Sequence, residues 1–191
     1  LKFMNLFYKN LIRPFLFRLD AERAHNWACQ ILSISEQSKI TRKFIKILHP
    51  TKRNQVKAFG LSFPNQIGLA AGMDKNGAYP KTFASLGFGH IEIGTITPQP
   101  QTGNAKPRLF RYPKYGALVN RMGFNNDGVE EVVKRIEKIY PKEKRVVPLG
   151  INIGKGKKTP IDIAHDDYIS CLRKCYKPVS YTHLRAHETR H

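Results

Sequence analysis

Acidic residues are scarce in this chain. Only 14 Asp and Glu stand against 33 Lys and Arg, which gives a formal net charge of +19 at pH 7. Such an imbalance favours a polyanionic neighbour, either nucleic acid or an acidic lipid surface. The 41% of hydrophobic residues nevertheless excludes a disordered polyelectrolyte and indicates a globular chain.

Cysteine is also rare, and long apolar runs are missing. Cys171 and Cys175 are separated by three residues and Cys29 stands alone, which excludes a C-x-x-C redox or zinc pair and indicates reduced thiols in a cytosolic setting. No stretch approaches the roughly 18 consecutive apolar residues of a membrane-spanning helix, and no signal-peptide cleavage site is present. We therefore expect any membrane contact to run along the membrane surface.

The N-terminal segment has amphipathic helical patterns. Apolar residues recur at helical spacing over residues 4–19 with basic residues on the other side, and Pro14 is expected to divide this segment into two pieces. Asp20 is a candidate N-cap for a second helix, whose apolar face includes Trp27 and Ile31. Two interpretations stay open: the helices pack on the domain, or they rest on a membrane.

From about residue 56 the pattern changes to alternating strands and helices. This alternation predicts an α/β fold with a parallel sheet, in which reactive groups follow the carboxyl ends of the strands. The predicted strands cover residues 67–69, 90–97 and 146–154, and the predicted helices lie around 80–86, 129–140 and 168–176.

A loop rich in small residues, GLAAGMDKNG at 68–77, follows the first predicted strand. Its glycines allow a flat or phosphorylated ligand to approach the backbone, and Lys75 adds a positive charge suited to a reduced flavin or an anionic substrate. Thr95 and Thr97 end the second strand and Asn152 lies near the end of the third, so these side chains are expected nearby. The alternative is a tight turn with Lys75 in solvent.

Several long motifs in fixed order carry a resemblance to a known family. Together they resemble dihydroorotate dehydrogenases of the membrane-associated, quinone-dependent class, and LDAERAH (19–25) resembles a start that the soluble classes lack. The motifs are NQIGLAAGMDKNG (65–77), GFGHIEIGTITPQPQTGNAKPRLFR (87–111), LVNRMGFNNDG (118–128) and LGINIGKGKKTP (149–160).

The resemblance implies a (β/α)8 TIM barrel that binds FMN. Residues 56–178 would form about the first half of it, because 191 residues fall short of the roughly 250 that a complete barrel needs. Residues 1–50 would form a helical extension that rests on acidic membrane lipids and shapes a quinone tunnel. The implied location is the cytoplasmic face of the bacterial inner membrane, or the mitochondrial inner membrane in a eukaryote.

The resemblance also implies a reaction, the oxidation of (S)-dihydroorotate to orotate in pyrimidine synthesis. A base removes a proton from C5, a hydride passes from C6 to N5 of FMN, and a quinone finally receives the electrons. No metal is expected. The implied FMN-binding residues are Ala71, Gly72, Met73, Asp74, Lys75, Thr95 and Asn152; the substrate-binding residues are Lys75, Asn120, Arg121, Met122, Gly123 and Phe124; and His25 and Arg111 would lie near the quinone tunnel.

The last residues depart from the family. After residue 178 the family continues into a fourth strand and an Asn/Ser-rich loop with the catalytic serine base, whereas VSYTHLRAHETRH (179–191) has no strand pattern and resembles translated non-native sequence. No serine of this chain is therefore assigned the catalytic role. We expect a truncated product that is insoluble or molten and inactive, because an incomplete barrel leaves strand edges open.

Three other interpretations are weaker. HETRH (187–191) fits the zinc-protease pattern H-E-x-x-H, but the chain ends at the second histidine and a third ligand held by the fold is missing. GINIGKGKKT (150–159) lacks the second glycine of a P-loop. A basic nucleic-acid-binding module is the alternative from another class, but the basic residues are spread over every segment and no module signature occurs, so no nucleic-acid partner is expected.

Overall fold

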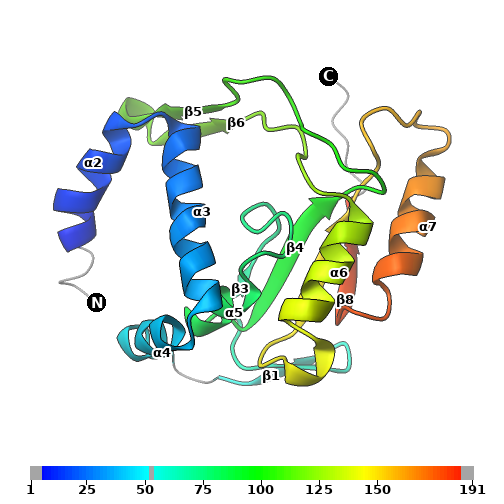
Figure 1. The fold of residues 1–191 in the computed structure, drawn as a ribbon, viewed down its shortest axis with the longest axis horizontal. Helices are drawn as coiled ribbons and strands as arrows, with labels where there is room; N and C mark the ends of the chain where they lie inside the picture. The colour runs from blue at the N-terminus through cyan, green and yellow to red at the C-terminus, as the bar shows by residue number, and fades with distance from the viewer. Residues whose placement is uncertain (1–5, 52–53, 186–191) are drawn as a thin grey trace.

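Four parallel strands form the central sheet of the computed structural model, which describes residues 6–51 and 54–185. The predicted alternation of strands and helices and the parallel sheet are confirmed. In Figure 1, α6 and α7 cover one face of the sheet. The strand order is β3 (Gly68–Leu69), β4 (His90–Ile96), β7 (Leu149–Ile153) and β8 (Tyr181–Leu184), and the connecting helices are α5 (Pro80–Ser85), α6 (Val129–Ile139) and α7 (Ala164–Cys175).

The hydrophobic core lies between the sheet and these helices. Ile91 and Ile93 of β4 and Ile151 of β7 point to the helical side and are fully buried, in contact with Val132 of α6 and its neighbours. Because side chains alternate along a strand, the opposite face carries a different set. This opposite face includes Glu92, Gly150 and Asn152. It is the inner face of the sheet, whose four described strands do not close into a barrel.

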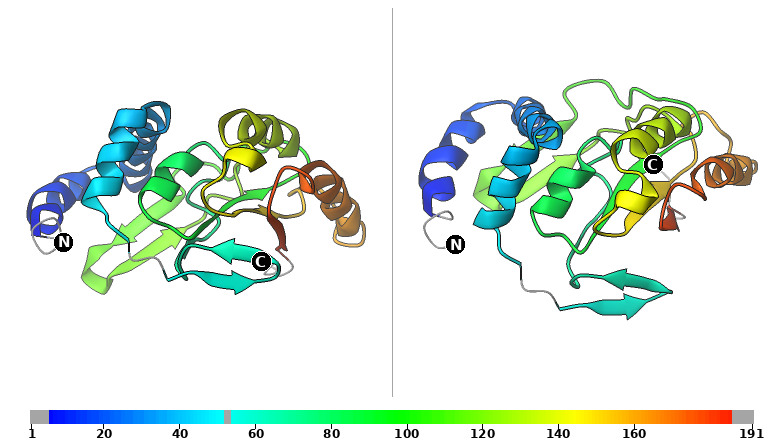
Figure 2. Two further views of the ribbon diagram at one scale, coloured as in Figure 1. Left: turned by 90° about the horizontal axis from the view of Figure 1, so that it is seen from below. Right: turned by 60° about the horizontal axis from the view of Figure 1, so that its bottom comes forward.

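Two antiparallel hairpins lie at opposite ends of the sheet (Figures 1 and 2). The hairpin of β1 (Val56–Ala58) and β2 (Leu61–Phe63) lies near the N-terminal ends of the parallel strands. The hairpin of β5 (Leu109–Tyr112) and β6 (Ala117–Asn120) lies at their C-terminal ends, with the 3-10 turn η2 (Pro113–Tyr115) at its tip. A further 3-10 turn, η3 (Lys142–Lys144), precedes β7.

The N-terminal helices form an arm beside the sheet. The π-helix η1 (Tyr8–Ile12) runs directly into α2 (Arg13–Arg18), and α3 (Ala21–Gln37) and α4 (Lys39–Leu48) follow. The expected division at Pro14 is wrong, since helical backbone continues through it. A π-helix and the first turn of a helix both tolerate a proline that lacks the N–H donor. The predicted N-cap is confirmed, because Asp20 Oδ1 accepts hydrogen bonds from the backbone N of Glu22 and Arg23 at 2.9 and 3.1 Å.

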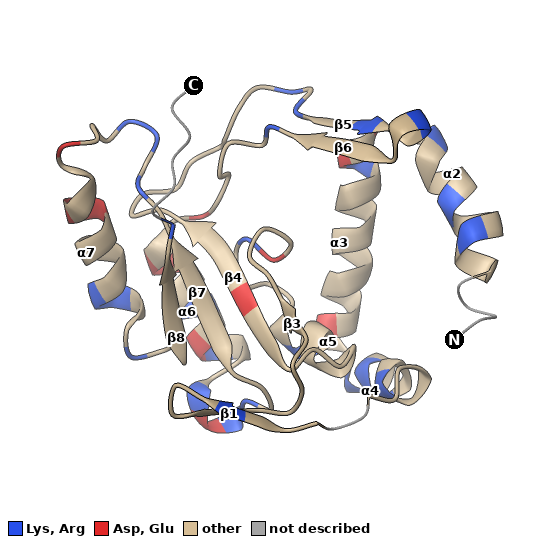
Figure 3. Cartoon of the chain, turned by 180° about the vertical axis from the view of Figure 1, so that it is seen from behind, with Lys and Arg blue, Asp and Glu red and all other residues tan. Residues whose placement is uncertain are grey.

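Two buried carboxylates attach this arm to the rest of the molecule, one near each end of α3 (Figure 3). Glu22 Oε1 accepts hydrogen bonds from Nε and Nη2 of Arg108 at 3.2 and 2.9 Å. The Glu36 carboxylate accepts hydrogen bonds from the backbone N and the hydroxyl of Thr82 at 2.8 and 2.9 Å and from Lys81 N at 3.2 Å. This side chain of α3 therefore caps the N-terminus of α5. None of the described helices is long and apolar enough to cross a membrane.

The segment after residue 178 contains a strand. β8 pairs in parallel with β7, with Tyr181 beside Gly150 and His183 beside Asn152. The expectation that no strand follows residue 178 is therefore wrong, because aromatic and β-branched side chains fit the open edge of β7. That residues 179–191 are non-native stays a prediction, and the HETRH sequence lies outside the described residues.

Candidate active site

A cavity of about 300 Å³ lies at the C-terminal ends of β3 and β4. It brings together loops from three separate parts of the chain: the glycine-rich loop after β3, the end of β4 and the segment after β6. Eight of the predicted site residues line it, although they lie as far apart in the sequence as residues 71 and 124. The lining residues are Ala71, Gly72, Lys75, Gly94, Thr95, Asn120, Met122, Gly123, Phe124 and Arg185.

Backbone hydrogen bonds fix the glycine-rich loop to the end of β4. Gly72 N donates to Gly94 O at 2.8 Å, and Gly94 N donates to Asp74 O at 3.1 Å. Gly72 has a φ of 112°, and apart from its two chain neighbours no residue has a heavy atom within 4 Å of a Cβ built on it. The backbone there faces open space, so a flat ring could approach it closely.

Asp74 has a structural task within this loop. Its side chain is buried, and its carboxylate accepts hydrogen bonds from Ala78 N at 2.8 Å and Tyr79 N at 2.9 Å. Burial raises the pKa of this carboxyl above its usual value, an effect that these backbone hydrogen bonds oppose. Asp74 thus holds the turn that presents Lys75 rather than lining the cavity with its side chain.

Lys75 points from the glycine-rich loop to the segment after β6. Its Nζ donates to Asn125 Oδ1 at 3.1 Å and lies 2.7 Å from Met122 Sδ. The alternative of a lysine in solvent is wrong, since the side chain is half-buried. Burial lowers the pKa of Lys75, and the positive charge of Arg108 adds to that effect.

The substrate-binding stretch that the resemblance implies is held by a loop that the site prediction missed. Asn104 N donates to Met122 O at 2.9 Å, and Asn104 Nδ2 donates to Arg121 O at 2.8 Å. At Gly103, where φ is 78°, a Cβ would lie 2.1 Å from Met122 O, so only glycine permits this approach. Asn104 lies in QTGNAKPR, the motif between β4 and β5, whose conformation sequence periodicity does not reveal.

Asn152, Met73 and Arg121 lie beside the cavity without lining it. Asn152 is buried, and its Oδ1 accepts a hydrogen bond from Thr95 Oγ1 at 2.6 Å, so it orients a residue that does line the cavity. Met73 packs against the hydrophobic core. Arg121 is exposed, and its backbone N donates to Arg108 O at 2.8 Å. The residues predicted to bind FMN and substrate therefore lie in one region, but some line the cavity and others support the residues that do.

His25 and Arg111 lie at the junction with the N-terminal arm. His25 Nε2 is 3.6 Å from Cys29 Sγ, and burial lowers the pKa of the imidazole. Arg111 Nη1 donates to Leu16 O at 3.1 Å, and its guanidinium lies 4.7 Å from the centre of the Phe17 ring. Neither residue lines the cavity, so their predicted place beside a quinone tunnel stays a prediction.

A metal-binding site is the other kind of site that the sequence raised. Within residues 6–51 and 54–185, no group of three or more His, Cys, Asp or Glu side chains could hold a metal ion. His183, one helical turn before the HETRH sequence, has its Nδ1 3.3 Å from Glu92 Oε1.

A comparison with protein-family models identifies the family to which this chain belongs. The family model described as dihydroorotate dehydrogenase matches residues 53–185. The chain belongs to the dihydroorotate dehydrogenase family. It is 49% identical over 172 residues to a dihydroorotate dehydrogenase (quinone) of Stenotrophomonas maltophilia (strain K279a), which covers 90% of this chain and 47% of that protein. A Chromobacterium violaceum protein of the same name is 50% identical over 171 residues, or 90% of this chain and 48% of that protein.

Solved structures agree with this assignment. The structure of dihydroorotate dehydrogenase from Eimeria tenella in complex with ferulenol matches with a TM-score of 0.63 and 36% sequence identity, covering 77% of this chain and 43% of that chain. The predicted fold class is confirmed, and the described sheet is an unclosed part of the barrel. The chain spans about half the length of the relatives it matches. The family match favours the flavoenzyme hypothesis over a nucleic-acid-binding module.

Proposed function

We propose that this chain supplies part of a flavoenzyme that oxidises (S)-dihydroorotate to orotate, with FMN as hydride acceptor and a quinone as final electron acceptor. The observation that carries the proposal is the single cavity into which eight predicted site residues converge from three loops. We further propose that this chain is inactive alone, because its described sheet is open and no serine base is assigned within it.

The residues around Gly72 fit a flavin. The open space above Gly72 suits a flat ring, and the hydrogen-bonded pair of Thr95 and Asn152 offers polar groups at the adjoining strand ends. When bound, FMN would accept a hydride from the substrate. The Lys75 ammonium supplies a fixed positive charge where negative charge develops, which is the usual contribution of a preorganised cation.

The segment after β6 fits the substrate. Dihydroorotate carries a carboxylate and an amide-like ring edge, and Lys75 with the amides of Asn120 and Asn125 offers a cation together with donors and acceptors. Asn125 was not among the predicted residues, although it lies within the motif at 118–128. Its contact with Lys75 Nζ supports a role in orienting that side chain.

The N-terminal arm fits a membrane surface from which quinone would enter. Trp27 and Ile31 of α3 and Phe44 of α4 are exposed apolar side chains, and the arm is rich in Lys and Arg. Helices of this kind lie at the interface of anionic membranes. We therefore propose peripheral association with acidic lipids, at the cytoplasmic face of the inner membrane in a bacterium.

A chimeric enzyme tests the proposed function. Residues 10–177 of this chain would replace the matching half of the Chromobacterium violaceum relative, and dihydroorotate-dependent quinone reduction and flavin absorbance would be measured. We expect a yellow, active protein. Lys75→Met should lower kcat/KM by at least about a hundredfold, because it removes a preorganised charge.

Lys134→Met is the matched control, since Lys134 is an exposed lysine of α6 whose Nζ lies 3.0 Å from Glu131. It should leave kcat/KM within about twofold of the parent chimera, as loss of a surface ion pair has little effect. A soluble, yellow chimera without dihydroorotate oxidation, or one indifferent to Lys75→Met, would contradict the proposal.

A further inference from the structure

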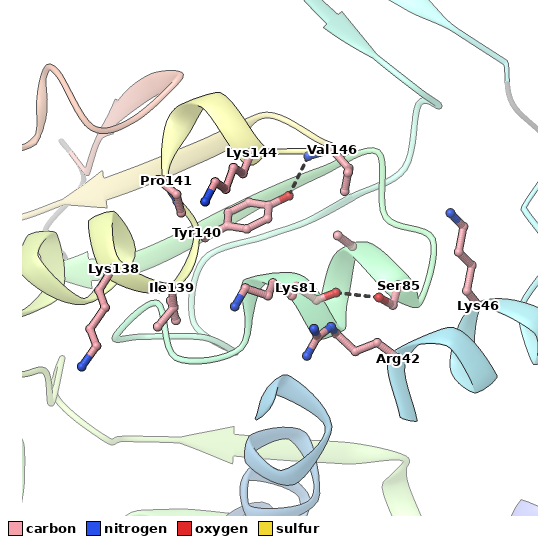
Figure 4. Close-up of a pocket in the computed structure, with 11 residues that line it drawn as sticks. Arg42, Lys46, Lys81, Ser85, Lys138, Ile139, Tyr140, Pro141, Lys144 and Val146 are labelled. Atoms are coloured by element: carbon pink, nitrogen blue, oxygen red, sulfur yellow. Dashed lines mark hydrogen bonds between the residues drawn. The ribbon is translucent and has the colours of Figure 1, made fainter. Parts of the chain in front are cut away.

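A second cavity, of about 400 Å³, is shown in Figure 4 and shares no lining residue with the candidate active site. It is bounded by α4, α5 and the segment that connects α6 to β7. Its wall contains five basic residues and no acidic residue. The basic residues are Arg42, Lys46, Lys81, Lys138 and Lys144, and Tyr140 contributes an aromatic surface with a hydroxyl group.

The cations of this wall have no carboxylate partner among the described residues, and Arg42 Nη1 donates instead to the backbone O of Ser35 at 3.0 Å and to that of Glu36. Nearby cations on α6 do have acidic partners: Lys134 Nζ lies 3.0 Å from Glu131 Oε1, and Arg135 Nη2 lies 2.8 Å from Asp127 Oδ2. In the part of the chain that the structure describes, no ion pair involves the four lysines of the cavity. Gathering like charges without a counterion is unfavourable, so the cavity is suited to an anion.

The neighbouring groups favour a phosphate. Figure 4 shows Arg42 and Lys81 near each other on one side and Tyr140 with Lys144 on the other. The Tyr140 hydroxyl accepts a hydrogen bond from Val146 N at 3.3 Å, which leaves its own proton for donation to a ligand. Guanidinium and ammonium groups bind phosphate oxygens through strong charge-assisted hydrogen bonds. A volume near 400 Å³ accommodates a phosphate with part of the molecule that carries it.

The outer face of α4 indicates where such a phosphate would come from. Ile40, Phe44 and Ile47 are 83%, 58% and 65% exposed and lie on the same helix as Arg42 and Lys46. A helix with an exposed apolar face and basic flanks is suited to the surface of an anionic membrane. We propose that this basic cavity binds a phosphate group, and that the α4 surface favours the headgroup of an anionic lipid over a soluble phosphate ester.

Two binding measurements on the full chain test the proposal and separate the two sources. Co-sedimentation would use phosphatidylcholine vesicles with and without phosphatidylglycerol, and calorimetric titration would use pyrophosphate in the absence of lipid. The variant is Lys138→Gln with Lys144→Gln. Its matched control is Lys57→Gln with Lys114→Gln, which removes the same charge from exposed lysines of β1 and η2. Circular dichroism would verify that both variants keep the parent's secondary structure.

We expect the cavity variant to weaken binding to phosphatidylglycerol vesicles by about tenfold through the loss of two charge-assisted contacts, while the control stays within about twofold. Selective weakening of pyrophosphate binding with unchanged vesicle binding would support the cavity but assign it to a soluble phosphate. Equal behaviour of both variants in both measurements would overturn the proposal. This test is independent of flavin chemistry, so it is separate from the failure or success of the proposed enzyme function.

Discussion

The N-terminal arm and the sheet region are built from similarly apolar helical and strand patterns, but they use them differently. Ile93 and Ile151 of the sheet are completely buried, whereas Ile31 of α3 is 64% exposed and Ile40 of α4 is 83% exposed. Buried polar contacts at Glu22 and Glu36 help to attach the arm, and Leu32 packs against the hydrophobic core. An amphipathic pattern therefore identifies an apolar face, but it does not identify what covers that face.

The same substitution in the two regions gives the largest expected contrast. Ile151→Ala removes buried methyl groups from the centre of the sheet and should lower the free energy of unfolding by about 4 kcal/mol. Ile31→Ala should change it by less than about 0.5 kcal/mol, because the side chain is largely in solvent and alanine favours the helix. Urea unfolding monitored by circular dichroism measures both values.

Comparable losses for Ile151→Ala and Ile31→Ala would mean that α3 buries its outer face against the protein. Absence of cooperative unfolding in the parent chain would instead support the prediction, made from the sequence, that the chain is molten. The two outcomes are distinguishable, because a molten chain keeps helical circular dichroism while it loses near-ultraviolet signal.

The sequence predicted the sheet better than the loops that complete the site. Ile91, Ile93 and Ile151 follow periodic patterns that determine which side of a strand is buried, so β4 and β7 were recognised. Asn104 and Gly103 act through backbone contacts with Met122 and Arg121, more than 15 residues further along the chain. Contacts of this kind leave no periodicity, so the sequence did not indicate that these two segments meet.

Glu36, near the C-terminal end of α3, provides the next prediction. Glu36→Ala removes the acceptor for Thr82 N, Lys81 N and the Thr82 hydroxyl, and should destabilise the protein by about 2 kcal/mol through loss of the α5 cap. Glu137→Ala, at an exposed position of α6, is the control and should have an effect below about 0.5 kcal/mol. Urea midpoints and amide exchange in α5 would measure the difference. Equal midpoints would show that the arm does not stabilise the sheet region.

Glu22, near the N-terminal end of α3, should make the attachment of the arm depend on pH. A hydrogen bond from Arg108 holds the pKa of Glu22 below its usual value. The folded-state pKa is lowered, so this stabilisation is complete above the usual pKa of a glutamate and is lost as the pH falls through the lowered value. Amide exchange of α3 should accelerate in acid in the parent chain. In Glu22→Gln the contribution of this residue to that acceleration should disappear, and an unchanged pH profile would contradict the role of Glu22.

The smallest expected effect on stability belongs to the exposed face of α3, where the effect on membrane binding should be clearest. Trp27 is the single tryptophan of the chain and is half exposed, so its fluorescence reports on this face alone. Vesicles containing phosphatidylglycerol should shift its emission to shorter wavelength, because the indole leaves water. Ile31→Ser should weaken this binding while changing the free energy of unfolding by less than about 0.5 kcal/mol. An emission wavelength that stays constant at saturating lipid would mean that the exposed residues of α3 contact another protein segment and not the membrane. The arm and the sheet region would then differ in which protein surface covers their apolar side chains.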